Sequence, residues 1–225
     1  MVFPLVKRIA AQTAVFLILF ALVFICAGTI HFWQGWLFCL VFWSSSIAMG
    51  IYFIEYNRPL LERRMRFGPW EESRPIEKVV ITLIFLMFVA LMIVAALDHR
   101  FAWSRVPGAV VVIANILIVA TFGFFIVVLD ANPFAASTIT VEAGQRVIST
   151  GPYAYVRHPM YSGALLLILA MPFALGSWWA LLVPVISTHL LIVRILDEER
   201  ALGAELAGYK DYLVAVPYRL IPRVW

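Results

Sequence analysis

Long stretches without charge alternate along this chain with short charged segments. Residues 9–54 contain no Asp, Glu, Lys or Arg, and further charge-free runs cover 79–97, 106–129 and 158–193. A transmembrane helix needs roughly 20 apolar residues. The first run is therefore long enough for two spans, and the next two suit one span each. We expect helices at about 9–30, 36–56, 78–97 and 107–129.

The last charge-free run has a different shape. Without its first two residues it leaves 160–193, which is too short for two full spans and a turn. Met171-Pro172 and Gly176-Ser177 interrupt it near the middle. This pattern predicts a tight helical hairpin, at about 159–171 and 177–202, whose two ends meet on one side of the membrane.

Composition supports a membrane protein and not a soluble domain. Hydrophobic residues make up 64% of the 225 residues, and charged residues only 13%. The N-terminal apolar run exceeds the length of a signal-peptide core and has no A-x-A cleavage site, so we expect an uncleaved first span. Cys26 and Cys39 lie inside apolar runs, which predicts buried thiols and no disulfide or metal site.

The basic residues predict an orientation. With the N-terminus inside, 15 of the 17 Lys and Arg residues face the cytoplasm, and only Arg100 and Arg105 lie outside. The segment 57–78 holds six of them and is expected to be a solvated cytoplasmic loop that can also meet anionic lipid head groups. We divide the chain into an N-terminal helix pair (1–56), this basic loop (57–78) and a membrane core (79–225).

The fold class that follows is an all-α polytopic integral membrane protein. It has about six transmembrane helices, including the C-terminal hairpin, and ends in a cytoplasmic helix at about 201–216 and an extended tail. Residues 134–158 are expected to be irregular or strand-like. Membrane lipids are the expected surroundings, nucleic acid is not an expected partner, and no feature specifies an oligomeric state.

Candidate chemistry begins at the segment T-G-P-Y-A-Y-V-R-H-P-M-Y-S-G, residues 150–163. Pro159 suits the first position of a helix, so Arg157 and His158 lie just ahead of a helix N-terminus, where N–H groups attract anions. Tyr153 and Tyr161 flank this point. The segment suits a ligand with both a carboxylate and a flat ring, although the same residue types also anchor helices at a membrane interface.

A second candidate lies where the hairpin leaves the membrane. Arg194 and Glu198 are four residues apart and share one helix face. They form either a surface ion pair of little consequence or part of a site, since ionisable residues at such a depth usually line a cavity. The hairpin should bring them next to residues 157–158.

Together these motifs resemble a known family. The pattern G-P-Y-x-Y-x-R-H-P-x-Y-x-G, a hairpin, R-x3-E in an acidic cluster, Y-x-x-Y and V-P-Y-R-L-I-P is similar to the isoprenylcysteine carboxyl methyltransferase family, over about residues 130–223. The resemblance implies methyl transfer from S-adenosylmethionine to a lipidic acceptor, by family name the carboxylate of an isoprenylcysteine. The first two helices and the loop 57–78 match nothing in this family.

The resemblance also implies site residues. Arg194 and Glu198 carry the catalytic roles, the arginine at the substrate and the glutamate at the cofactor, with Glu199 replacing Glu198 if the register is off by one. No metal is implied. The implied cofactor-binding residues are His158, Pro159, Met160, Tyr161, Tyr153, Gln145, Arg146, Val147, Ile148 and Glu198.

Two alternatives remain open. Membrane sterol and steroid reductases, which use NADPH, share R-H-P-x-Y and V-P-Y-R-x-x-P, although this chain has Met160 where many of them have asparagine. A non-enzymatic membrane subunit or lipid-binding protein is the other. Binding of adenosylmethionine or of NADPH separates these classes.

Overall fold

The computed structural model describes residues 2–65, 68–72, 74–135, 137–138 and 144–225, with side chains from Val6 onward. Within these ranges all regular structure is helical, and no strand occurs. Arg66, one of the six basic residues of the segment 57–78, lies outside the described residues, as does part of the segment 134–158. The elements are α1 (Val2–Ala27), α2 (Trp33–Tyr56), α3 (Arg58–Arg64), α4 (Pro75–Phe101), α5 (Gly108–Ala131), η1 (Gly151–Ala154), α6 (Pro159–Ala174), η2 (Trp179–Leu181), α7 (Leu182–Glu205) and α8 (Tyr209–Ala215).

Five helices are long and apolar enough to cross a membrane: Val6–Ala27, Trp33–Tyr56, Pro75–Phe101, Gly108–Ala131 and Trp179–Glu205. The apolar helix α6 is shorter. The chain is thus an all-α, multi-pass membrane protein, as the charge-free runs predicted. α1, α2 and α4 begin three to seven residues before their predicted starts, and α4 and α5 end two to four residues after their predicted ends, because charged and interfacial residues join the helices. α1 ends three residues before its predicted end, at Ala27.

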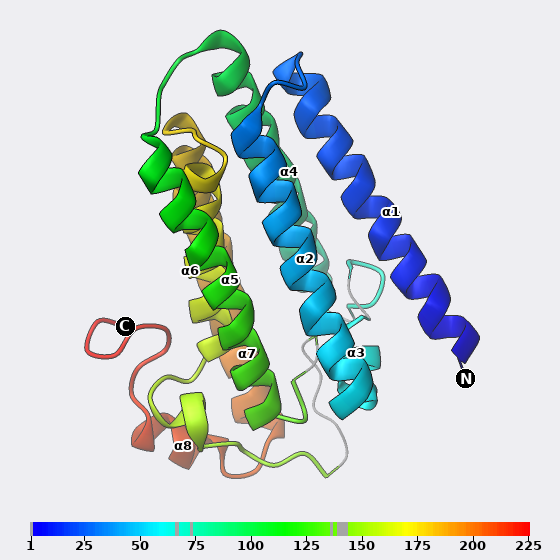
Figure 1. Ribbon diagram of the computed structural model, residues 1–225. Coiled ribbons are helices and arrows are strands. Elements are labelled where there is room, and N and C mark those ends of the chain that lie inside the picture. The colour runs from blue at the N-terminus through cyan, green and yellow to red at the C-terminus, as the bar shows by residue number, and fades with distance from the viewer. Residues whose placement is uncertain (1, 66–67, 73, 136, 139–143) are drawn as a thin grey trace.

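The helices stand side by side in a bundle (Figure 1). α5 has its most extensive contact with α6, while α4 packs on α1 and α7, and α2 packs on α5. Gly163 permits the close approach of α6 to α5, since a Cβ there would lie 2.5 Å from the Phe125 ring. The core of the bundle is built largely from aromatic and long aliphatic side chains, such as Phe38, Phe42, Leu91 and Ile118.

The predicted hairpin is present, with a different turn. Pro172 does not end the first arm but lies inside α6, which continues to Ala174. The break comes at Gly176, whose φ of +76° is a left-handed conformation that glycine adopts without strain. η2 and α7 then return along α6.

The segment after α7 departs from the predicted single helix at 201–216. α7 ends at Glu205, Gly208 takes a φ of +79°, and α8 starts anew at Tyr209. The turn folds α8 back, so that Leu206, Tyr209, Tyr212 and Val216 form a small cluster with Val147. Val147 is one of the predicted cofactor-binding residues, and its side chain packs into this cluster.

Different segments of the chain lie at the two ends of the bundle. The N-terminus, α3, η1, α8 and the tail gather at one end, and the turns between α1 and α2, α4 and α5, and α6 and η2 gather at the other (Figure 1). We call these the α8 end and the turn end. The segments that the basic residues assigned to one side of the membrane therefore do lie at one end.

The segment 57–78 is not the solvated loop that was expected. It contains the helix α3 and the first turn of α4, and Glu72 and Glu77 are buried. The expectation weighed its basic residues alone, whereas its two buried acidic residues tie it to the core.

Candidate functional site

A cluster of charged side chains lies at the α8 end, centred on Arg194. This residue lies in the middle of α7 and is buried. Its Nε donates to the Tyr161 hydroxyl at 2.9 Å, and Nη2 donates to the Ser137 carbonyl oxygen at 2.8 Å. The remaining contacts are to two carboxylates of the segment 57–78, those of Glu72 and Glu77.

Tyr161 connects Arg194 to Glu198. The Tyr161 hydroxyl accepts from Arg194 Nε and donates to Glu198 Oε2 at 2.5 Å. Tyr161 comes from the first turn of α6, so the hairpin does bring the two predicted motifs together. Arg194 and Glu198 are bridged by Tyr161 and do not act as a simple surface ion pair.

Glu199 forms a second, adjacent cluster. Its Oε1 accepts from Arg157 Nε at 2.7 Å and lies 3.3 Å from His158 Nε2, while Oε2 accepts from Arg219 Nε at 2.9 Å. The His158 and Tyr161 rings stack with their centroids 5.6 Å apart, which joins the two clusters. The two glutamates that the sequence left as alternatives thus have different partners.

The C-terminal tail after α8 uses N–H groups at the site where the sequence predicted an anion to bind, just ahead of α6. The N–H groups of Arg157 and His158 donate to the carbonyl oxygens of Tyr218 and Arg219, both at 2.9 Å. The N–H groups of Tyr161 and Ser162 donate to the His158 carbonyl oxygen, both at 3.0 Å. The N–H groups of these four residues are therefore paired within the chain, and the tail holds the start of α6 in place.

The remaining predicted residues surround these clusters to different degrees. Tyr153 is buried, and its carbonyl oxygen accepts from the Tyr212 hydroxyl at 2.8 Å. Burial raises the pKa of Tyr153, Tyr209 and Tyr212, so these phenols stay neutral. Pro159 is buried and Met160 is half-buried at the start of α6. Of the segment 145–148, Arg146 is exposed and the others are half-buried.

Three residues near Arg194 escaped the sequence analysis: Glu72, Glu77 and Ser137. Asp197 belongs to the acidic cluster of the R-x3-E motif. Asp197 is buried, and its Oδ1 accepts from Arg74 Nη2 at 2.9 Å. The signal that could have found the two glutamates is their setting in W-E-E-S-R-P-I-E, where they stand on either side of Arg74-Pro75 in a segment with more basic than acidic residues.

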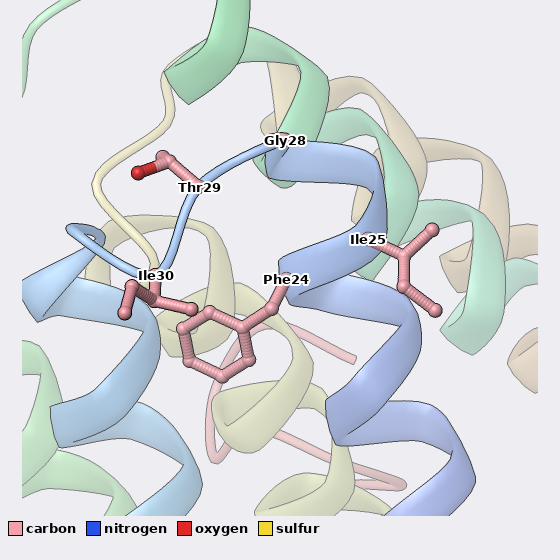
Figure 2. A pocket seen from close by; sticks show the side chains of 5 residues that line it. All are labelled: Phe24, Ile25, Gly28, Thr29 and Ile30. Carbon is pink, nitrogen blue, oxygen red and sulfur yellow. The ribbon is translucent and has the colours of Figure 1, made fainter.

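In the part of the chain that the structure describes, these clusters are not arranged as a metal site, and the surface depression lies at the opposite end of the bundle. Among the described residues no group of three His, Cys, Asp or Glu side chains is arranged to hold a metal ion, and Cys26 and Cys39 are free thiols. An open depression of about 580 Å³ lies at the turn end, where α1 meets the turn to α2. Figure 2 shows its lining, which is apolar apart from the Thr29 hydroxyl, so it offers no chemistry of its own.

Two comparisons with known proteins each cover less than half of the chain. The mouse (Mus musculus) protein Delta(14)-sterol reductase TM7SF2 is 31% identical over 99 residues, which are 43% of this chain and 24% of that protein. The model of the "Isoprenylcysteine carboxyl methyltransferase (ICMT) family" matches residues 110–204. This segment contains His158, Tyr161, Arg194 and Glu198. The match confirms the resemblance that the motifs indicated, in that residues 110–204 are similar to the isoprenylcysteine carboxyl methyltransferase family.

Proposed function

We propose that this protein transfers a methyl group from S-adenosylmethionine to a lipidic acceptor, the carboxylate of an isoprenylcysteine-type molecule. One observation carries the proposal. The Tyr161 hydroxyl lies between Arg194 and Glu198, next to the His158–Glu199 contact. This arrangement joins the H-P-x-Y and R-x3-E motifs, which are 33 residues or more apart, inside the segment that the family model matches.

The residues at the start of α6 fit the cofactor. S-adenosylmethionine supplies a methyl group on a positively charged sulfur. Aromatic faces and a carboxylate favour such a cation, and Tyr161 and Glu198 provide both within one hydrogen bond. His158, Pro159, Met160, Tyr153 and the segment 145–148 complete the set that would hold the cofactor.

Arg194 would orient the acceptor. A carboxylate is already ionised at neutral pH and needs no base before it attacks the methyl group. The planar guanidinium holds a carboxylate through two parallel hydrogen bonds, which fixes its direction of attack. The work left to the protein is to align two reactants, and such alignment can supply much of a rate enhancement.

The position of the clusters suits a lipid-borne acceptor. They lie at the end of a bundle of apolar helices, where a lipid tail can stay in the membrane while its polar end reaches Arg194. We further propose that residues 79–225 form the catalytic core and that the α8 end faces the cytoplasm, as the basic residues suggest. Cysteines placed at positions 62 and 100 should then label from inside and outside, respectively.

The experiment uses the purified chain in detergent or in lipid nanodiscs. Calorimetry measures the binding of S-adenosylhomocysteine, and a labelled-methyl assay measures transfer to prenylcysteine carboxylates, lipid amines and thiols. Cofactor binding with transfer to the carboxylate supports the proposal. A protein that binds no S-adenosylhomocysteine contradicts it.

A sterol-type reductase is the second candidate, because of the likeness to the mouse sterol reductase over 99 residues. That likeness covers a quarter of the mouse protein, and so it concerns a shared segment more than a shared reaction. Binding of NADPH in place of S-adenosylhomocysteine would favour this candidate.

A further inference from the structure

Glu72 occupies a position on Arg194 that the proposed function does not explain. It lies in the connection between α3 and α4, and its side chain is 1% exposed. Its Oε1 accepts from both terminal nitrogens of Arg194, Nη1 and Nη2, each at 3.3 Å. This point between the two terminal nitrogens is where a carboxylate bound by a guanidinium lies.

The other partners of Arg194 are held more firmly. Glu77 contacts Nη1 from the first turn of α4. Tyr161 and the Ser137 carbonyl contact Nε and Nη2 at 2.9 and 2.8 Å. Within the described ranges, Glu72 Oε2 and Glu77 Oε1 are both buried without a hydrogen-bond partner, which costs free energy at each carboxylate. The contacts of Glu72 are the longest that Arg194 makes, so Glu72 is the partner that is easiest to replace.

The chain around Glu72 can release it. Trp70 and Glu71, the two residues before it, are exposed. Moving the Glu72 side chain outward therefore takes no large apolar side chain out of the core. Glu77 lies in a helix and is fully buried, so it has no comparable way out.

Resting on the methyl transfer proposed above, we infer that Glu72 occupies the subsite of the acceptor carboxylate and exchanges with the acceptor on Arg194. The exchange replaces one negative charge by another, so Arg194 keeps its balance of charge. An acceptor that bound beside Glu72 would instead add a further anion to a buried group that already holds Glu72 and Glu77, which is unfavourable. Glu72 is thus a specificity-determining residue: it yields to an anion and excludes neutral acceptors.

The test compares Glu72→Gln and Glu72→Ala with a matched control, Glu71→Gln, which changes the exposed neighbour. Equilibrium binding of an S-prenylcysteine free acid and of its methyl ester is measured for each variant. Removing the competing charge should tighten binding of the free acid roughly tenfold, since a charged hydrogen bond is replaced by a weaker neutral one or by none. Binding of the methyl ester and of S-adenosylhomocysteine to the Glu72 variants should change by less than roughly twofold. Binding of the free acid and of the methyl ester to the Glu71→Gln control should also change by less than roughly twofold.

The outcomes separate the inference from the proposed function. If the free acid binds both Glu72 variants no more tightly than wild type, or binds none of the proteins, Glu72 does not occupy an acceptor subsite, even when S-adenosylhomocysteine still binds. If tightening is equal for acid and ester, Glu72 is a steric block and the inference is wrong. If wild type fails to bind S-adenosylhomocysteine, it is the proposed function that fails.

Discussion

Both ends of the bundle contain buried carboxylates, but the two ends differ in how fully the carboxylate oxygens are hydrogen-bonded. At the turn end, Asp98 is 1% exposed. Its Oδ1 accepts from the Ser104 N–H at 2.7 Å, and its Oδ2 accepts from the hydroxyls of Ser104 and Ser177, both at 2.5 Å. Small neutral donors from two turns satisfy both oxygens and tie α4 to the hairpin.

At the α8 end, the buried carboxylates are only partly satisfied. Within the described residues, Glu72 Oε2, Glu77 Oε1 and Asp197 Oδ2 are buried without a hydrogen-bond partner. Their other oxygens accept from the guanidinium groups of Arg74 and Arg194. A fully satisfied carboxylate stabilises a fold, whereas a partly satisfied group stores free energy that a ligand can use. The turn end is thus a structural joint, and the α8 end is the candidate site.

The largest effect that this comparison predicts is for Arg194→Met. The substitution leaves Glu72 and Glu77 buried without their cation, so the free energy of unfolding should fall by about 3–5 kcal/mol and methyl transfer should be lost. Thermal and denaturant unfolding in detergent measure the first, and the labelled-methyl assay the second. Arg200→Met on the same helix is the control, because Arg200 is exposed; equal stability of the two variants would contradict the central role of Arg194.

Asp98→Asn should affect stability and leave function intact. The amide keeps the shape of the group but loses its charged acceptors, which predicts a loss of about 1–3 kcal/mol in the free energy of unfolding. Binding of S-adenosylhomocysteine should be the same as in wild type. A selective loss of that binding would place the turn end in the site and remove the contrast between the two ends.

Glu198→Gln and Glu199→Gln should separate the two neighbouring glutamates. Glu198 faces Tyr161, so loss of its charge should weaken binding of S-adenosylmethionine roughly tenfold, about 1.4 kcal/mol. Glu199 is tied to Arg157 and Arg219, so its variant should loosen the tail. Calorimetry measures the first effect, and proteolysis of the tail measures the second. Exchange of the two results would assign the cofactor to Glu199.

The smallest effect is expected for Arg58→Gln, also at the α8 end. Arg58 and Glu62 form an exposed i,i+4 ion pair with a distance of 3.2 Å. Such pairs contribute about 0.5 kcal/mol or less, so unfolding and transfer should both stay close to wild type. A large effect would show that charge anywhere at this end matters, and not the buried clusters in particular.

The sequence predicted the parts of this structure that local patterns determine. Charge-free runs set the spans, and Gly176 and the shortness of the last run set the hairpin. The hairpin was expected to bring Arg157 and His158 next to Arg194 and Glu198. In the structure Tyr161 makes that contact, and Arg157 and His158 contact Glu199 instead. It did not predict the role of Glu72 and Glu77. Their burial depends on a contact with a residue more than 100 positions away, and no local period reports such a contact. The sequence also did not predict the position of the tail. The carbonyl oxygens of the tail accept hydrogen bonds from N–H groups just before α6, which have no partner within that helix.

The length of α6 has a consequence for where the proposed reaction would take place. With 16 residues it is about 24 Å long at 1.5 Å per residue, against about 30 Å for the hydrocarbon layer. Trp178 and Trp179, just beyond its far end, are exposed and are of the residue type that lies at head-group level. With that end at head-group level, the shortfall of about 6 Å would fall at His158 and Tyr161 and place them toward the acyl chains. The acceptor proposed above would then reach them without leaving its leaflet, and the thickness of the bilayer would set how deep its polar end lies.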